Sequence, residues 1–356
     1  MFFVKAVVYL SLLFEISSSL QVCHAKEGVQ GLQNAHLQFF GDLYLSYRAI
    51  KETKSSVHNP NMFKNITHLL SSAKHNIVNF EGVATTARMP KELKSYLLKM
   101  PTWVGKNLYK ANIKYASLAN NHSLDYGSMG LFDSLTLLSS AGIRTFGAGM
   151  SLNEATQPLV ISDGQRFICM LAFNRTLPTS FWAKKDQPGS AFLDYQKTRD
   201  AIRVCKKNKY FTIVSFHWGV ERTHTPKAYQ KELAHLSINA GADMVIGHHP
   251  HVLQSIEIYK SKPIFYSLGN FAFSSYTLHS PQQGMSVRVK FPKDTTGKKR
   301  PTYDLVPLNV QNKVVKFHPR HFKNDEENPL EAFIPDQYCK KHSAAKIKAT
   351  YYHCRF

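Results

Sequence analysis

The sequence predicts an α/β fold, because segments typical of strands alternate with segments typical of helices along most of the 356-residue chain. Short apolar runs bounded by polar residues are typical of buried strands. They lie at residues 37–40, 77–80, 115–118, 144–146, 167–173, 211–216 and 244–246. Hydrophobic residues make up 43% of the chain, which excludes a disordered chain and provides for a sizeable core.

Two segments between the apolar runs have helical patterns. Leucines recur at near-helical spacing in residues 131–141, and Gly142 then stops the pattern. Residues 226–240 begin with a proline and end before Gly241, as is typical of a helix. The dipeptide Asp163-Gly164 separates two apolar runs and predicts a hairpin.

The alternation changes after about residue 278. Residues 285–291 and 303–310 are typical of strands, and no helical pattern lies between them. We therefore expect one domain over residues 33–278, further strands packing on it within 279–320, and a polar peripheral tail over 321–356.

Residues 1–25 have the pattern of a secretory signal peptide. Lys5 precedes an apolar run at 6–14, and small residues three apart precede a cleavage point after Ala25. The run is too short for a membrane span of about 20 residues. We expect a secreted or cell-surface protein, with an uncleaved signal anchor as the alternative. Four cysteines then remain, which permits two disulfides, for example Cys339–Cys354, or else free buried thiols.

Several of the strand-like runs end directly in polar side chains of the types that can bind metals. These candidates are Asp42, Glu81, Asn121, His122, His217, His248, His249 and His251. Functional sites of open α/β sheets form at the carboxyl ends of the strands. We therefore expect these side chains to converge on one cleft.

This set of side chains suits a divalent metal centre. Carboxylate and amide oxygens are hard ligands, and imidazoles add affinity for Zn, Mn or Fe. Two ions that share a carboxylate would activate water and hold a phosphoryl group. His122 is the candidate general acid, and Asp125 would fix its tautomer. Each residue also has a structural alternative: Asp42 taken alone is typical of a turn or cap, and His217 of a buried core histidine.

The net charge of +21 arises from 45 Lys and Arg against 24 Asp and Glu. Basic residues gather in residues 88–114, 184–209 and 288–300. Such a surface attracts polyanions, and charge alone admits nucleic acid, anionic lipid or an acidic polymer. For any single cluster, an ordinary solvated surface is the alternative.

Longer motifs surround the candidate residues. They are Gly41-Asp42, Asn79-Phe80-Glu81, the segments 118–127, 147–155, 217–221 and 241–254, and the run from Tyr266 to Phe271. In this order they resemble the CapA family of capsule and poly-γ-glutamate synthesis proteins, which belongs to the calcineurin-like metallophosphoesterase superfamily, over residues 37–275. The resemblance implies an α/β, metallophosphoesterase-like two-sheet sandwich flanked by helices, with the site at one rim and a β-rich C-terminal extension.

The resemblance also implies roles for the candidates. Glu81 takes the place of a bridging carboxylate, and His122 that of the acid. The positions that match metal ligands are Asp42, Asn121, His217, His249 and His251, with His248 retained as a further candidate. The residues expected beside the ligands or the substrate are Asn79, Asn120, Glu221 and Asn270.

The first motif departs from the superfamily pattern. That pattern is Asp-x-His, whereas Asp42 is followed by Leu43 and Tyr44. One imidazole is therefore missing from the first metal position.

Together these features lead us to expect a secreted or surface-associated CapA-like protein of poly-γ-glutamate synthesis or export. Its hydrolase-type site would hold one or two divalent ions (Mn, Zn, Fe or Mg). The expected partner is the acidic polymer, membrane synthase components are candidate partners, and nucleic acid is not expected. The alternatives are a metal-dependent phosphoesterase acting on an unrelated phosphate ester, and a non-catalytic polyanion-binding module with a vestigial site.

Overall fold

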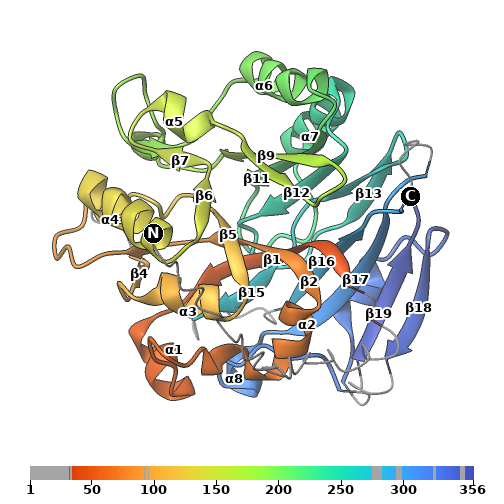
Figure 1. Ribbon diagram of the computed structural model, residues 1–356, viewed down its shortest axis with the longest axis horizontal. Helices are drawn as coiled ribbons and strands as arrows, with labels where there is room; N and C mark the ends of the chain where they lie inside the picture. Colours follow the sequence, from red (N-terminus) through yellow and green to blue (C-terminus); the bar gives the residue numbers. More distant parts are fainter. Residues whose placement is uncertain are drawn as a thin grey trace, which may run out of the picture.

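The computed structural model describes residues 32, 34–91, 94, 96–274, 283–293, 299–323, 326–344 and 349–356. Two large β-sheets pack against each other, and helices cover their outer sides (Figure 1). The expected α/β two-sheet sandwich flanked by helices is confirmed. The expected signal segment, residues 1–25, lies outside the described residues.

The first sheet has nine strands and is centred on β1, Ala35–Tyr44. Strands β2 and β15 run parallel to β1, and β16 runs antiparallel to it. The order is β18-β19-β17-β16-β1-β2-β5-β6, with β15 also beside β1. The other bounds are β2 Ala73–Phe80, β5 Ile113–Ser117, β6 Arg144–Phe146, β15 Asn270–Phe273, β16 Gln283–Lys290, β17 Thr302–Asn309, β18 Cys339–Ala344 and β19 Ala349–Cys354.

The second sheet has six strands in the order β13-β14-β12-β11-β9-β8. Its bounds are β8 Leu159–Ser162, β9 Phe167–Asn174, β11 Phe211–His217, β12 Met244–His248, β13 Ile256–Tyr259 and β14 Lys262–Phe265. The predicted hairpin at Asp163-Gly164 joins β8 to β9. Asp163 Oδ1 accepts hydrogen bonds from the backbone N–H groups of Gln165 and Arg166 at 2.7 and 2.8 Å, which holds this turn.

Two short pairs complete the strands: β3 Val83–Ala84 with β4 Lys99–Met100, and β7 Ala148–Gly149 with β10 Gly189–Ser190. The helices are α1 Tyr47–Thr53, α2 Thr67–Ser71, α3 Val104–Lys110, α4 Gly127–Ser140, α5 Leu152–Thr156, α6 Tyr195–Lys207, α7 Ala228–Ala240 and α8 Asn312–Val315. Short 3₁₀ turns are η1 Asn61–Ile66, η2 Thr179–Phe181 and η3 Pro329–Phe333. Among the described residues, no helix is both long and apolar enough to cross a membrane.

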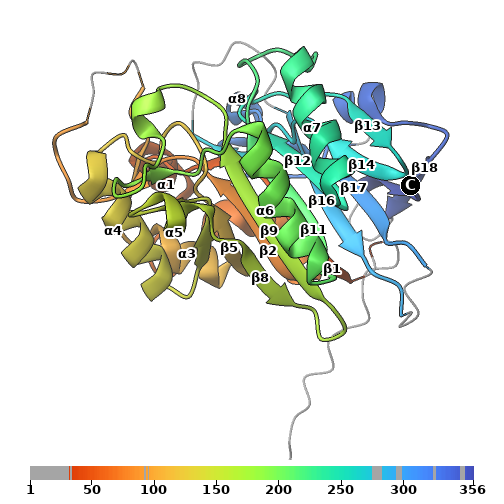
Figure 2. The ribbon, with the colours of Figure 1, turned by 90° about the horizontal axis from the view of Figure 1, so that it is seen from above.

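Both predicted helices are present. Helix α4 begins four residues before the predicted leucine repeat, at Gly127. Helix α7 ends at Gly241, whose φ of 116° is in the left-handed region that favours glycine. Figure 2 shows α6 and α7 lying across the second sheet, where Ile202 and Leu233 pack with Val214 of β11.

The C-terminal segment is more than the polar tail expected over 321–356. Strands β19 and β18 extend the large sheet beyond β17, and Cys339–Cys354 links them with a Cα–Cα distance of 4.1 Å. Tyr351 and Tyr352 of β19 are buried, whereas the middle of β18 is exposed. Because β18 is an exposed edge strand of mainly polar residues, its sequence lacks the apolar signal of a strand. A second disulfide, Cys169–Cys205, joins β9 to α6.

We predict that the C-terminal strands contribute to the same cooperative core as the rest of the domain. Val306 of β17 is fully buried, so Val306→Ala is expected to lower the free energy of unfolding by about 2 kcal/mol. The matched control Val204→Ala, at a position that is 58% exposed on α6, is expected to change it by less than about 0.5 kcal/mol. Urea unfolding followed by tryptophan fluorescence measures both. Equal effects of the two substitutions would contradict a shared core.

Candidate metal centre

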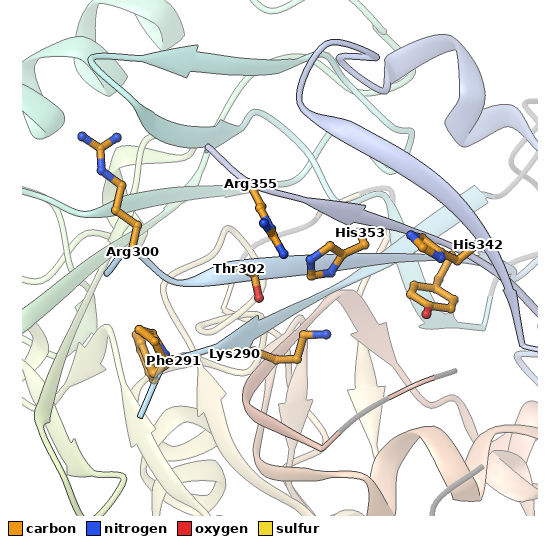
Figure 3. Close-up of a pocket in the computed structure, with 9 residues that line it drawn as sticks. Lys290, Phe291, Arg300, Thr302, His342, His353 and Arg355 are labelled. Atoms are coloured by element: carbon orange, nitrogen blue, oxygen red, sulfur yellow. The ribbon is translucent and has the colours of Figure 1, made fainter. Parts of the chain in front are cut away.

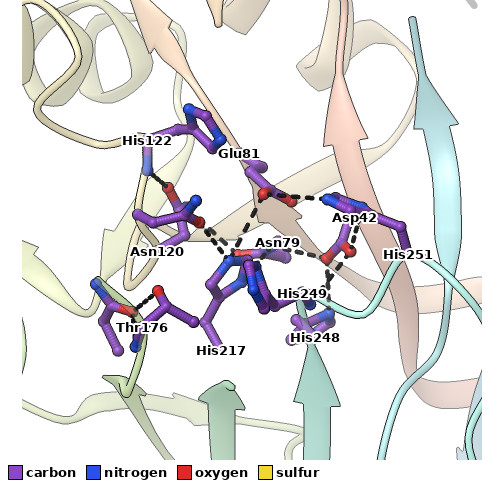
Figure 4. Close-up of polar contacts among 12 residues, drawn as sticks. Asp42, Asn79, Glu81, Asn120, His122, Thr176, His217, His248, His249 and His251 are labelled. Atoms are coloured by element: carbon purple, nitrogen blue, oxygen red, sulfur yellow. Dashed lines mark hydrogen bonds and ion pairs between the residues drawn. The ribbon is translucent and has the colours of Figure 1, made fainter. Parts of the chain in front are cut away.

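The carboxyl ends of strands from both large sheets meet at one rim of the sandwich (Figure 4). In the first sheet Asp42 of β1 lies in register with Asn79 of β2 and with Asn270 of β15. In the second sheet His217 of β11 lies in register with His248 of β12. Parallel strands end at the same edge, so the polar residues that follow them are brought together.

Asp42 is a fully buried carboxylate surrounded by donors. Asn79 Nδ2 donates to its Oδ1 at 2.8 Å, and the backbone N–H of His249 donates to its Oδ2 at 3.3 Å. His248 Nδ1 is 3.3 Å from Oδ1, and His251 Nδ1 is 3.1 Å from Oδ2. Although burial favours the protonated form, hydrogen bonds from His248 and His251 hold the pKa of Asp42 well below its usual range.

Glu81 is equally buried but has no comparable set of donors. Neither carboxylate oxygen has a hydrogen-bond partner among the described residues, and Oε1 lies 3.6 Å from Nε2 of both His217 and His251. Burial raises the pKa of Glu81 well above its usual range, although the charge on His251 opposes this. A buried carboxylate without hydrogen-bond partners favours a cation beside it.

The imidazoles around the two carboxylates differ in the direction in which their pKa values are shifted. Burial lowers the pKa of His251, but Glu81 and the hydrogen bond to Asp42 outweigh this effect and raise it to about 10. Burial and the nearby His251 instead lower the pKa of His249 to about 3. Burial and His249 likewise lower the pKa of His217 well below its usual range. The site therefore favours positive charge between the carboxylates and neutral, ligating imidazoles at His217 and His249.

Three groups of side chains offer donor atoms close enough to hold one ion. The donor atoms within each group lie within 4.8 Å of one another. The groups are Asp42 with Glu81 and His251; Glu81 with His217 and His249; and Glu221 with His249 and His251. Asn121 Oδ1 lies 2.7 Å from His217 Nε2, so its amide borders the second group. The first two groups share Glu81, as expected for a bridging carboxylate, and the residues present thus fit divalent ions.

His248 lies beside the centre but belongs to none of these three groups. Its Nδ1 points at Asp42, which it helps to hold, while His249 and His251 supply the donor atoms. Tyr44, which occupies the position of the missing first-motif imidazole, packs its ring 5.5 Å from that of Phe273. Burial raises the pKa of Tyr44 to about 12, so its phenol stays neutral there.

His122 and Asp125 form a hydrogen-bonded pair next to the ligand groups. His122 Nδ1 is 2.7 Å from Asp125 Oδ2, which also accepts from the backbone N–H of Leu98 at 2.8 Å. Lys94, which we predicted only as part of a basic cluster, donates to Asp125 Oδ1 at 2.7 Å and to the carbonyl of Asn121 at 2.8 Å. Lys94 lies in an irregular segment before β4, and no spacing in the sequence relates it to Asp125.

The remaining candidates lie around the ligand groups. Asn120 donates from Nδ2 to the carbonyl of Phe80 at 2.9 Å, and its Oδ1 accepts from the backbone N–H of His122 at 3.0 Å, so it holds the turn that carries His122. Asn270 Oδ1 is 3.0 Å from His251 Nδ1. Glu221 is exposed and marks the solvent side of the centre.

The backbone that presents the histidines is strained. His249 and His251 have φ values of 95° and 58°, in the left-handed region that non-glycine residues rarely adopt. Gly247 lies so close to the neighbouring strand that a Cβ there would be 2.0 Å from the carbonyl oxygen of Tyr266. Strain of this kind persists where surrounding contacts enforce it, and it is concentrated at functional sites.

The sequence matches the family described as bacterial capsule synthesis protein PGA_cap over residues 36–275. It is 30% identical over 274 residues to the PGA biosynthesis protein CapA of Bacillus subtilis (strain 168), covering 76% of this chain and 70% of the relative. It is 29% identical over 278 residues to the capsule biosynthesis protein CapA of Bacillus anthracis, covering 76% and 66%. A probable polyglutamine synthesis accessory protein of Mycobacterium tuberculosis (strain CDC 1551 / Oshkosh) is 36% identical over 165 residues, 43% of each chain.

Solved structures are similar at lower levels of sequence identity. A hypothetical protein from Thermus thermophilus aligns with a TM-score of 0.45 at 13% identity, covering 76% of this chain and 97% of that one. A putative 5'-nucleotidase from Staphylococcus aureus aligns with a TM-score of 0.41 at 12% identity, covering 72% and 51%.

We predict that the metal-free protein loses stability between about pH 6.5 and pH 10. The pKa of His251 is 6.5 in the unfolded chain and about 10 in the fold, so the stabilisation is complete below the lower value and is lost as the pH rises through the higher one. The raised pKa of Glu81 acts in the same direction. Urea unfolding of EDTA-treated protein across this range measures the loss.

His251→Gln is expected to flatten this pH dependence, because the titrating imidazole is gone. The control His58→Gln, at an exposed histidine of the loop after α1, is expected to leave it unchanged. Added Mn²⁺ or Zn²⁺ is expected to reduce the loss in the unmodified protein, since an ion replaces the proton. Identical pH profiles for His251→Gln and the unmodified protein would contradict the prediction.

Proposed function

The chain belongs to the bacterial capsule synthesis protein PGA_cap family, and from this premise we propose that it is a secreted or surface-associated accessory protein of poly-γ-glutamate synthesis or export. Its metal-competent rim would act on an end of the polymer or on a precursor. The observation that carries the proposal is the convergence of Asp42, Glu81, His217, His249 and His251 on one buried centre in a chain of this family.

The donor groups sharing Glu81 would hold one or two divalent ions. Such ions, when bound, supply a water of lowered pKa and neutralise developing negative charge on a substrate. Asp42 and Glu81 would be the anionic ligands, and His217 and His249 neutral ones. His251 would become a neutral ligand when a bound ion replaces its proton. Asn79, His248 and Asn270 orient the side chains of Asp42 and His251 through the contacts described above.

His122 would deliver a proton to the leaving group. Asp125 holds the Nδ1 proton of the imidazole, so the proton that is delivered is a second one, carried on Nε2 of the charged ring. Burial lowers the pKa of His122, and the hydrogen bond and charge of Asp125 oppose this effect. Lys94 forms an ion pair with Asp125 from its other side, which fixes the position of the carboxylate that accepts from His122.

The electrostatic character of the chain supports an acidic polymer as the substrate. A net charge of +21 attracts a polyanion over several ångströms and raises its local concentration. Lys94, one of the members of the basic cluster at 88–114, lies directly at the centre. The proposed location outside the cytoplasm is supported by the signal-like sequence at residues 1–25 and by two disulfides, which persist in oxidising compartments.

A metal-dependent phosphoesterase acting on an unrelated phosphate ester is the second candidate function. The two ligand groups that share Glu81, with the His122–Asp125 pair beside them, favour it, because the same arrangement would clamp the oxygens of an in-line phosphoryl transfer.

The proposal predicts metal-dependent shortening or release of the polymer. Purified full-length chain is expected to contain at least one equivalent of Mn, Zn, Fe or Mg by elemental analysis, and Asp42→Asn to contain less, because one anionic ligand is lost. Incubation with γ-linked glutamate oligomers of defined length, followed by mass spectrometry, measures the reaction. A panel of phosphate esters is run in parallel.

The outcomes separate the functions. Metal-dependent change of the oligomers that Asp42→Asn abolishes supports the proposal, and turnover of phosphate esters alone supports the second candidate. Metal-free protein that binds oligomers without changing them would instead identify a non-catalytic binding module.

We further predict that His122 acts on the substrate and Lys94 acts through Asp125. On whichever substrate is turned over, His122→Asn is expected to lower kcat by about 10²–10⁴-fold while the metal content stays unchanged. Lys94→Met is expected to lower kcat less and to shift the pH profile of kcat, since it removes the positive charge that is paired with Asp125. Lys106→Met, at an exposed position of the same basic cluster, is the matched control and is expected to leave both measurements unchanged.

A further inference from the structure

A pocket lies on the C-terminal strands, outside the residues that match the family and apart from the metal centre. It has a volume of about 410 Å³ and is bordered by β16, β17, β18 and β19. Figure 3 shows Arg300 and Phe291 at one end, His342 at the other, and Arg355, Lys290 and His353 between them. Its size is within the range of about 300–1,000 Å³ that holds ligands of many atoms.

Strand alternation places the charged residues of this pocket on one face of the sheet. Lys290 pairs with Thr302 across β16 and β17, and Asp304 pairs with His353 across β17 and β19. Their neighbours Tyr303 and Val289 point the other way, into the core between the two sheets. The polar lining is therefore fixed by the same register that builds the core.

One buried carboxylate sits within the basic lining and is already neutralised. Asp304 is fully buried, with Lys290 Nζ 2.8 Å from its Oδ2 and His353 Nδ1 2.9 Å from its Oδ1. In the part of the chain that the structure describes, neither Arg300 nor Arg355 forms an ion pair with an acidic side chain. Arg300 only approaches the carbonyl of Ser261, at 3.4 Å. These two guanidinium groups are left to bind an external anion.

The chemistry of the lining suits anionic groups, such as carboxylates, that are joined by apolar spacers. A planar guanidinium binds a carboxylate through two parallel hydrogen bonds. The rings of His342 and Tyr351, stacked 5.3 Å apart, supply an apolar wall against which methylene groups pack, whereas Phe291 borders the pocket with its ring packed into the core. An acidic chain with a carboxylate on every unit and methylenes between offers both features.

We propose that this pocket binds a segment of a γ-linked glutamate chain, as a second contact apart from the metal centre. The identity of the polymer rests on the proposed function, whereas the anion site rests on the pocket alone. Antiparallel pairing of Val289 with Leu37 puts the pocket toward the opposite end of β1 from Asp42. Asp42 lies five residue steps beyond Leu37 along the strand, which is about 17 Å, so only an oligomer of several units reaches both places.

The test is direct binding. Affinity of fluorescently labelled γ-glutamate decamer for the full-length, metal-loaded chain is measured by anisotropy at low and moderate salt. The paired substitution Arg300→Gln with Arg355→Gln is expected to weaken binding by about tenfold or more, because two charge-assisted contacts are lost. The control Lys231→Gln, at an exposed position on α7, is expected to change it by less than about twofold.

Further measurements identify the ligand and test whether each variant is still folded. Inorganic phosphate and single-stranded DNA of the same length compete for the labelled decamer, and each is expected to compete more weakly than unlabelled γ-glutamate. Arg355→Lys is expected to recover part of the affinity, since it keeps the charge and loses the fork. Urea unfolding of each variant verifies that the fold is retained.

The outcomes are distinguishable from those for the metal centre. Decamer binding that the paired substitution leaves unchanged overturns the pocket but not the proposed function. Stronger competition by phosphate or DNA overturns the assignment of the ligand. Loss of decamer binding in the paired variant, with shortening of trimers by the metal centre unchanged, supports a separate polymer site.

Discussion

The structure depends on how two carboxylates, Asp42 and Glu81, are kept in one site that is buried from bulk solvent. Two negative charges in such a place are costly unless positive charge lies between or beside them. Asp42 obtains donors from side chains on either side, whereas Glu81 obtains none. Its charge is balanced by His251, by a bound ion or by a proton on Glu81 itself, because burial raises the pKa of that carboxyl. The edge where both sheets end supplies these partners. His249 and His251 reach this edge with a strained, left-handed backbone.

Much of this arrangement could be predicted because it follows from the period and direction of strands. Polar residues at the ends of parallel strands must meet, so Asp42, Glu81 and His217 could be grouped from the sequence. Strand direction could not show whether His248 or His249 supplies a donor atom to the centre. That choice depends on the left-handed backbone at His249, which the sequence does not reveal. Lys94 could not be found because it lies in an irregular segment, where side-chain direction follows from tertiary contacts alone.

The C-terminal strands were underestimated for a related reason. Strand β18 is exposed along most of its length, so it buries too little apolar surface to show a pattern, and the disulfide and its pairing with β19 hold it in the sheet instead. The strands that carry the basic pocket are joined edge to edge with β1, which carries Asp42. One continuous sheet thus positions both the metal-competent rim and a cationic surface directed to the outside.

Strand β1 is synthesised early, but two of the strands that pair with it, β15 and β16, are synthesised much later. Ribosomes release the N-terminus first, so Asp42 and Glu81 emerge long before His251 and Asn270, which lie more than a hundred and fifty residues later. Until then β1 has β2 to pair with but neither β15 nor β16. Contacts this distant in sequence form slowly. The candidate ligand groups around Asp42 and Glu81 therefore become complete only after the segment that carries His249 and His251 has been synthesised.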